Sequence, residues 1–437
     1  MNDPFWLIAI KGVVVFVLLV LLVLFTIWYE RRLVAIMQVR PGPNRNGPFG
    51  ILQSLADGLK LAFKEDIMPR TADKVVFLAA PAIAVTCAFT AFAVIPFGPE
   101  VSVFGHQTAL QMTDFEVSVL LILATSAVGV YGIVLAGWSS GSSYSLLGSL
   151  RAAAQVISYE IALGLAVLGV FFQSQLMSTG AIVEAQSEGI PMRLGSFEIT
   201  LPGWYFLVLA PSFVIFVIAM VGETNRAPFD LPEAESELVA GFGTEYSSLK
   251  YASFFLAEYI NMVTMSALCV TLFLGGWAAP FPDSWWPAAN EGWMPLIWFF
   301  AKVLLFLSFY VWLRGTLPRF RYDQFMRLGW KVLVPVSLVW VLVLAAMNIG
   351  LDAGNDMPTR IAFAGGAAIV VMALIFFWPT RKPYEPPAEP DTGLGGFPVP
   401  PLDLVVPPNP RGLTEIGRER ETAGALESGA DEHQEEA

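Results

Sequence analysis

Residues Gly222–Tyr259, which begin G-E-T-N-R-A-P-F-D-L-P-E-A-E-S-E-L-V and end F-F-L-A-E-Y, form a polar stretch between two long apolar runs. Its first part, residues 222–250, holds six acidic residues and only two basic ones. A seventh acid, Glu258, lies inside the following apolar run. Carboxylates beside or within a bilayer are unfavourable unless they are paired, hydrated or protonated. This pattern therefore indicates a functional site.

A solvated acidic loop is the alternative interpretation of this stretch. Two prolines, Pro228 and Pro232, stiffen the backbone around Asp230. Glu258 lies seven residues into a predicted helix, where solvation by bulk water does not apply. The stretch also carries apolar side chains unsuited to a loop that meets only water: Phe229, Leu231, Leu238, Val239 and Phe242.

The overall composition is that of a membrane protein. The 437 residues are 55% hydrophobic and 14% charged, whereas soluble domains carry about 25% charged residues. Nine apolar segments approach the ~20 residues needed to cross a bilayer. They lie at roughly 5–29, 76–97, 115–137, 151–172, 203–222, 251–276, 293–313, 331–350 and 360–378. The sequence thus predicts an all-α polytopic membrane protein with nine transmembrane helices.

The distribution of Lys and Arg predicts the orientation of these helices. The connections after the first, third, fifth and seventh segments carry eight, one, two and five basic residues, and the opposite ones only Arg193 and Arg360. We therefore expect the N-terminus outside, with residues 30–75, 138–150, 223–250 and 314–330 in the cytoplasm. The opening M-N-D-P-F-W has neither a basic region nor a small-residue cleavage site, so the first segment is expected to remain as a span.

Residues 51–66 predict an amphipathic helix in the first cytoplasmic connection. Apolar side chains recur at helical spacing on one face, and polar ones fall on another. The apolar face comprises Leu52, Leu55, Leu59 and Phe63, and the polar face Gln53, Asp57, Lys60 and Lys64. Such a helix is too short to span and is expected to lie in the membrane interface. It is either an ordinary anchor or the border of a cavity entrance.

The last part of the chain changes character. Residues 380–437 contain ten prolines and twelve acidic residues against five basic ones. A segment of this composition cannot bury enough apolar surface to fold. We expect a transmembrane helical domain over residues 1–379, followed by a disordered, Pro-rich, acidic cytoplasmic tail over residues 380–437.

Two further ionisable residues lie deep in apolar segments. Glu160 follows Arg151 by nine residues, which places it ~13 Å further along a helix. A charged carboxylate at that depth costs roughly 2.5–3.5 kcal/mol and indicates function. Lys302 is the matching buried base, and we expect it to pair with either Glu160 or Glu258.

The cysteines and histidines predict no metal or haem site. Cys87 and Cys269 lie far apart in apolar runs, and His106 and His433 lie outside them. No spacing suits a disulfide, a zinc ion or an iron–sulfur cluster. Any redox cofactor is therefore expected in another chain.

Five stretches of this sequence resemble the quinone-site membrane subunit of proton-pumping NADH:quinone oxidoreductase (respiratory complex I), the NuoH family. They span residues 1 to about 350. The stretches are E-R-R…Q-V-R-P-G-P-N-R-N-G, A-D-G-L-K-L-A-F-K-E, L-R-A-A-A-Q-V-I-S-Y-E, the segment that begins G-E-T-N-R-A-P-F-D-L-P, and P-R-F-R-Y-D-Q.

The resemblance implies a multi-pass subunit in the bacterial cell (plasma) membrane. It also implies a narrow tunnel for a quinone substrate, menaquinone or ubiquinone, that is not covalently bound. Flavin and iron–sulfur clusters would belong to hydrophilic partner subunits. Other partners would be antiporter-like membrane subunits, reached from the tunnel by a chain of acids.

The resemblance also assigns residues to these roles. The proton or charge relay would comprise Glu160, Glu223, Asp230, Glu233, Glu235, Glu237 and Glu258. The quinone tunnel and its portal would involve Arg31, Arg40, Asp57, Lys60, Lys64, Arg226 and Phe229. Physical reasoning leads to the same relay. Glu233, Glu235 and Glu237 are closely spaced, and like charges raise each other's pKa, so the group holds mobile protons.

Three other functions compete with this one. A related proton-pumping hydrogenase subunit would share the lineage without using quinone. A free-standing cation/proton transporter would use the buried carboxylates, although no paired broken helices in matching halves are evident. A passive anchor for a soluble redox module would explain the basic connections but would leave Glu160 and Glu258 without a purpose.

Overall fold

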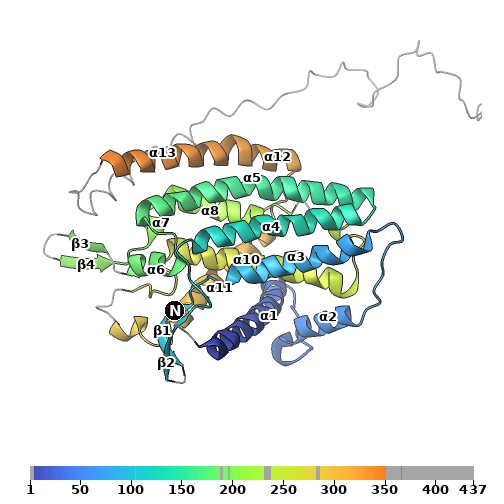
Figure 1. Ribbon diagram of the computed structural model, residues 1–437, viewed down its shortest axis with the longest axis horizontal. Coiled ribbons are helices and arrows are strands. Elements are labelled where there is room, and N and C mark those ends of the chain that lie inside the picture. The colour runs from blue at the N-terminus through green and yellow to red at the C-terminus, as the bar shows by residue number, and fades with distance from the viewer. Residues whose placement is uncertain are drawn as a thin grey trace, which may run out of the picture. The chain divides into compact units, whose positions relative to one another are not determined.

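The computed structural model describes residues 4–103, 105–187, 190–194, 197–230, 238–281 and 286–350, together with Gly366. Within this part, seven helices are long and apolar enough to cross a membrane (Figure 1). They are α1 (Phe5–Met37), α3 (Lys74–Phe92), α4 (Ser118–Ser139), α5 (Ser143–Ser174), α10 (Ser248–Phe273), α11 (Met294–Thr316) and the continuous helix Tyr322–Met347. The all-α polytopic architecture is confirmed.

The number of nine spans is not confirmed. The segment expected at 203–222 forms two helices, α7 (Tyr205–Val208) and the short apolar α8 (Ala210–Glu223). Pro211 lies in the first turn of α8, where a missing N–H is tolerated, so the chain restarts a helix there. The expected ninth span at 360–378, apart from Gly366, and the tail at 380–437 lie outside the described residues.

The eighth expected span is longer than its apolar run. It consists of α12 (Tyr322–Leu328), a π-helical turn (η4, Gly329–Leu333) and α13 (Val334–Gly350). The turn lies where Gly329 meets an aromatic ring, since a Cβ there would come within 3.1 Å of Tyr159 Cε2. π-Helical turns within α-helices occur often at functional sites.

Helix α10 forms the centre of the bundle. Its most apolar window is 78% buried, whereas that of α1 is only 17% buried and leaves a broad apolar face exposed. Helix α5 lies alongside α4, α8 and α13. Small residues permit these close approaches, because a Cβ on Gly137 would lie 2.1 Å from Ser149 Oγ. The site described below lies around α10 and the end of α8.

Two β-hairpins, which the sequence did not lead us to expect, lie in connections between helices. Strands β1 (Gly98–Val103) and β2 (His106–Leu110) pair antiparallel, as do β3 (Ile190–Leu194) and β4 (Phe197–Leu201). Gly105, with a φ of 84°, supplies the tight turn of the first hairpin. Figure 1 places both hairpins at the ends of the helices opposite to α2 (Gln53–Ala62).

Helix α2 has the predicted two-sided character but is shorter than residues 51–66. The apolar residues on and directly beside it are exposed: Leu52 50%, Leu55 44%, Leu59 51% and Phe63 87%. A row of exposed leucines suits a helix that lies against lipid. On the other face, Asp57 forms an ion pair with Arg31 of α1. The remaining described elements are the short helix α6 (Thr179–Ser187) and three 3₁₀ helices, η1 (Pro48–Gly50), η2 (Gly241–Gly243) and η3 (Pro287–Asn290).

Candidate functional site

The polar residues at the end of α8 are separated by a sharp turn of the backbone. Glu223 is the last residue of α8, and the Thr224 N–H donates to Met220 O at 3.1 Å. Asn225 then takes a φ of 52°, a left-handed conformation that asparagine tolerates better than most residues. Glu223 and Arg226 therefore have different partners, although only two residues separate them: Glu223 accepts a hydrogen bond from Ser126, and Arg226 pairs with Glu258.

Arg226 lies at the centre of a buried ion network. Its Nε is 3.0 Å from Glu258 Oε1 of α10, and its Nη1 is 3.9 Å from Glu30 Oε1 of α1. The guanidinium lies 4.0 Å from the centroid of the Tyr259 ring, a favourable cation–π distance. Burial alone would lower the pKa of Arg226, but Glu258, Tyr259 and Glu30 raise it above its usual value. The guanidinium therefore stays charged.

Glu30 joins this network to a third helix. It is 6% exposed, accepts a hydrogen bond from Tyr259 Oη at 2.7 Å and forms an ion pair with Arg314 of α11. The two arginines and two carboxylates balance in formal charge. Such compensation is what allows several charges to be buried together.

Several buried atoms at this junction lack a hydrogen-bond partner among the described residues. They include Arg226 Nη2, Asn225 Oδ1 and Glu223 Oε2. Beside Arg226 is a cavity of about 10 Å³, lined by Glu30, Tyr310 and Arg314 among others, which is room for about one water molecule. We call it the Arg226 cavity.

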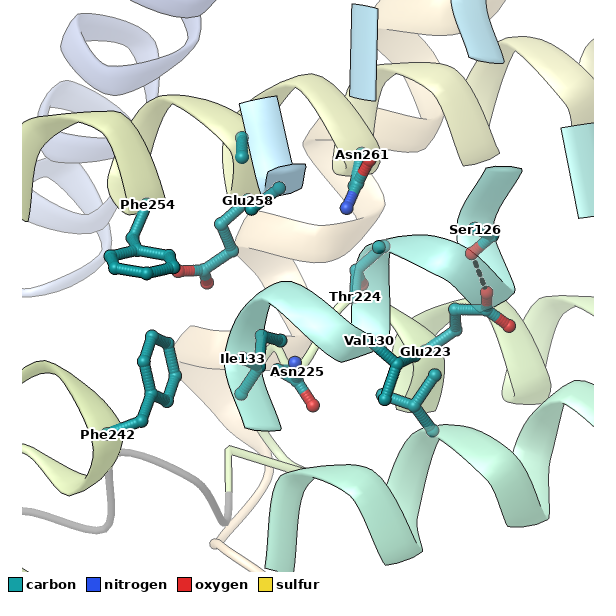
Figure 2. A pocket seen from close by; sticks show the side chains of 14 residues that line it. Ser126, Val130, Ile133, Glu223, Thr224, Asn225, Phe242, Phe254, Glu258 and Asn261 are labelled. Carbon is teal, nitrogen blue, oxygen red and sulfur yellow. Dashed lines mark hydrogen bonds between the residues drawn. The ribbon is translucent and has the colours of Figure 1, made fainter. Parts of the chain in front are cut away.

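A second cavity, of about 60 Å³, lies between α4, α8 and α10 and is called here the Glu223 cavity. Figure 2 shows Glu258 on α10 and Glu223 on α8, with Asn261, Thr224 and Asn225 between them in that view. Ser126 of α4 donates a hydrogen bond to Glu223 Oε1. The volume suits about four water molecules, and the free Glu223 Oε2 and Asn225 Oδ1 are acceptors for them.

A third and larger cavity, of about 740 Å³, lies beside the end of α1 and is called here the α1 cavity. Its polar lining includes Glu30, Arg31, Arg40, Tyr259 and Arg314. Its apolar lining includes Ile27, Val34 and Phe255. Volumes of 300–1,000 Å³ are typical of small-molecule sites. Glu30, Arg314 and Tyr259 thus contact both the α1 cavity and the Arg226 network.

The structure brings some of the predicted site residues together and not others. Glu258 pairs with Arg226 in the ion network and lines the Glu223 cavity with Glu223, while Arg31 and Arg40 line the α1 cavity. Glu160 is half-buried on α5 and does not line these cavities. Lys60 and Lys64 are exposed on and after α2. Glu233, Glu235 and Glu237 lie outside the described residues.

Asp230 and Phe229 point away from the ion network. Asp230 pairs with Arg319 at 2.5 Å, and Phe229 packs in an aromatic cluster with ring centroids 4.7 Å from Phe325 and 5.5 Å from Phe320. The Phe320 N–H also donates to Pro228 O at 3.1 Å. These contacts fix the 226–230 segment against the connection between α11 and α12.

The expectation that Lys302 pairs with Glu160 or Glu258 is wrong. Its ammonium group donates instead to three backbone carbonyls, those of Leu274 at 2.7 Å, Gly276 at 3.0 Å and Ala278 at 2.6 Å. An ammonium has three N–H groups, and all three are used. The carbonyls follow the end of α10, where unpaired carbonyls favour a cation.

Sequence reasoning missed Glu30, Tyr259 and Arg314 as site residues. Glu30 stands beside the basic residues at the end of the first apolar run, and Tyr259 directly follows Glu258. Arg314 was explained by orientation alone. The sequence signal for Glu30 was an acidic residue directly after an apolar run. A similar signal, an acidic residue within an apolar run, identified Glu258. Among the described residues there is no cluster of three metal-ligating side chains.

Comparison with known proteins identifies the family of this chain. The NADH dehydrogenase family model matches residues 10–345. The NADH-quinone oxidoreductase subunit NuoH of Streptomyces avermitilis is 52% identical over 443 residues, which cover 98% of this chain and 94% of that protein. The chain therefore belongs to the NADH dehydrogenase family, as a membrane subunit of the NuoH type that its motifs resemble.

Proposed function

We propose that this subunit of a NADH:quinone oxidoreductase forms part of the quinone tunnel and couples quinone reduction to proton translocation through buried carboxylates. One observation carries the proposal. Glu30 and Tyr259 line the α1 cavity, and both lie within about 4 Å of the Arg226 guanidinium. Arg226 in turn pairs with Glu258, which lines the Glu223 cavity. A binding cavity and a carboxylate cavity thus share one ion network.

The α1 cavity has the size and lining that a quinone needs. A quinone combines a polar head with a long apolar tail. Arg31 and Arg40 offer hydrogen-bond donors to carbonyl oxygens, and Ile27, Val34 and Phe255 offer apolar contacts. The Asp57 carboxylate restrains Arg31 through an ion pair. Lys60 and Lys64 belong to the proposed portal by their place on and after α2.

Coupling follows from electrostatics in a poorly solvated site. Reduction of a quinone changes charge and takes up protons beside Glu30, whose carboxylate is held by two arginines and a tyrosine. A change there alters the balance between Arg226 and Glu258, because buried charges interact strongly over a few ångströms. The protonation of interacting carboxylates then shifts as a group.

The relay continues from Glu258 through the waters of the Glu223 cavity to Glu223 and Glu160. Glu233, Glu235, Glu237 and Asp230 complete the proposed acid chain, on the strength of the resemblance and their spacing. The polar end of the subunit faces the cytoplasm with the tail, and the N-terminus lies outside. Flavin and iron–sulfur clusters belong to hydrophilic partners, and antiporter-like subunits receive the charge signal.

Filling the α1 cavity tests the quinone site. Val34 lines it, whereas Ile36, two residues further on α1, is 64% exposed. We expect Val34→Trp to raise the KM for quinone about tenfold, and Ile36→Trp to change it less than twofold. The NADH:ferricyanide reaction, which bypasses quinone, stays unchanged in both. Equal KM values for the two variants would place quinone elsewhere.

Purification separates this function from a free-standing cation/proton transporter. In mild detergent, the proposed subunit is expected to co-purify with flavin and iron–sulfur proteins. A transporter would run alone and would keep its transport activity after reconstitution by itself.

A further inference from the structure

Gln155 of α5 is a fully buried amide that contacts two separate points of the chain. Its Nε2 donates to Gly222 O at 2.7 Å and to Phe229 O at 2.9 Å. Gly222 is next to the last residue of α8, so its carbonyl lacks a partner within the helix. One side-chain amide therefore closes the 222–229 loop.

The orientation of this amide follows from its surroundings. Its two hydrogen-bond partners are both carbonyl oxygens, which accept hydrogen bonds and cannot donate them. Only the NH₂ group, with two donors, satisfies both. A carboxylate or an apolar side chain at this position would leave both carbonyls buried without a donor.

The neighbouring turn of α5 supports the same loop by packing. Tyr159 stacks on Phe325 with ring centroids 4.1 Å apart and donates its hydroxyl to Phe325 O at 3.0 Å. Its ring also lies against Gly222, where a Cβ would come within 2.6 Å of Tyr159 Cδ1. The 222–229 loop is thus held against α5 at both ends, by hydrogen bonds and by shape.

The loop that Gln155 closes carries the two charged residues that face different cavities. Glu223 faces the Glu223 cavity, while Arg226 lines the Arg226 cavity and pairs with Glu258. Gln155 lines none of the three cavities. It therefore does not contact the proposed quinone cavity or the two cavities beside the charged residues.

We infer that Gln155 is a positioning residue, whose amide sets the separation between Glu223 and Arg226 and so controls charge coupling without touching quinone. This inference rests on the proposed function, but it concerns the loop and not the α1 cavity. Loss of the amide releases the loop, and Arg226 then divides its contacts differently between Glu30 and Glu258. The relay slows while quinone binding is unaffected.

Three variants in the assembled complex test the inference. Gln155→Leu removes both donors, whereas Gln155→Glu removes both while the carboxyl is ionised and only one when it is protonated. Gln173→Leu is the matched control, because 18 residues separate it from Gln155 on the same helix, which is five turns and places it on the same face ~27 Å away. Quinone reduction, proton translocation and NADH:ferricyanide activity are measured per assembled complex.

We expect Gln155→Leu to lower the kcat of quinone reduction about tenfold at any pH, with the quinone KM unchanged within twofold. Gln155→Glu recovers activity, relative to wild type, as the pH falls from about 8 to about 6, because a protonated carboxyl regains one donor and burial raises its pKa. Gln173→Leu behaves as wild type.

Two results would overturn the inference. One is wild-type kcat in Gln155→Leu at normal assembly. The other is an equal loss in Gln155→Leu and Gln155→Glu at every pH, which indicates a packing role only. A wrong assignment of the quinone site gives a different result. It leaves the quinone KM of Val34→Trp unchanged, independently of the kcat values of the Gln155 variants.

Discussion

Arg226 and Lys302 are both buried cations, but their partners differ in kind. Arg226 lies between the carboxylates of Glu30 and Glu258, with a cavity beside it. Lys302 has its three N–H groups on three backbone carbonyls and its ammonium 4.5 Å from the Trp204 ring centroid. The first set of partners can gain or lose protons, whereas the second cannot.

This difference separates a responsive site from a structural one. Partners that titrate change their charge when a nearby reaction does, and they pass that change on. Backbone carbonyls have fixed dipoles and hold the end of α10 in place. A buried charge within a membrane helix is thus a starting hypothesis for function, and the nature of its partners decides the outcome.

Removing Arg226 is expected to have the largest effect on activity. Arg226→Ala leaves Glu30 and Glu258 with less compensation and lowers quinone reduction and proton translocation about a hundredfold, or about 2.7 kcal/mol. Lys250→Ala is the control, because Lys250 pairs outside the network with Asp66, whose side chain is 56% exposed, and is expected to change activity less than twofold. Equal losses in the two variants would remove the distinction between the network and a surface ion pair.

Removing the ammonium of Lys302 is expected to reduce the amount of complex and not its turnover. Lys302→Met leaves three buried carbonyls without a donor, at about 1–3 kcal/mol each. We expect about tenfold less assembled complex on native gels, with wild-type activity per assembled complex. Normal assembly with impaired proton translocation would instead make Lys302 part of the relay.

Neutralising Glu223 is expected to have a smaller effect. Glu223→Gln keeps the volume and a hydrogen bond to Ser126 but removes a proton acceptor from the Glu223 cavity. Proton translocation and quinone reduction should fall together about fivefold. Quinone reduction at the full rate without translocation would show that the two processes run independently of this residue.

The smallest effect is expected from Ser126, which only orients the Glu223 carboxylate. Ser126→Ala should lower turnover about twofold, the scale of one lost hydrogen bond that water can replace. Thr125→Ala is the neighbouring control, since its hydroxyl bonds only to backbone carbonyls of α4. A large effect of Ser126→Ala would make the hydroxyl itself part of proton transfer.

The sequence predicted the helical architecture because hydropathy and helix length are local properties. Glu258 and Glu160 were identified for the same reason, since an acid within an apolar run is visible without a structure. The break between α7 and α8 was not predicted, although Pro211 marks it. The hairpin at Gly98–Leu110 was also missed, because its short strands lack a strong alternating pattern.

Pairings between distant residues could not be predicted in this way. Arg314 and Glu30 are 284 residues apart, and nothing local indicates that α1 and α11 bring them together. The partners of Lys302 were mistaken because backbone carbonyls carry no sequence signature. Gln155 lies within a motif of the family, but its role depends on two carbonyls, 67 and 74 residues further along the chain.

The most direct test of the ion network is proton translocation by proteoliposomes that contain the assembled complex with Glu258→Gln. This change preserves side-chain volume and removes one of the two carboxylates that compensate Arg226. The account predicts that NADH-driven quinone reduction and proton translocation both fall at least tenfold, while NADH:ferricyanide activity and quinone KM stay at wild-type values. Wild-type turnover with wild-type translocation in this variant would contradict the account.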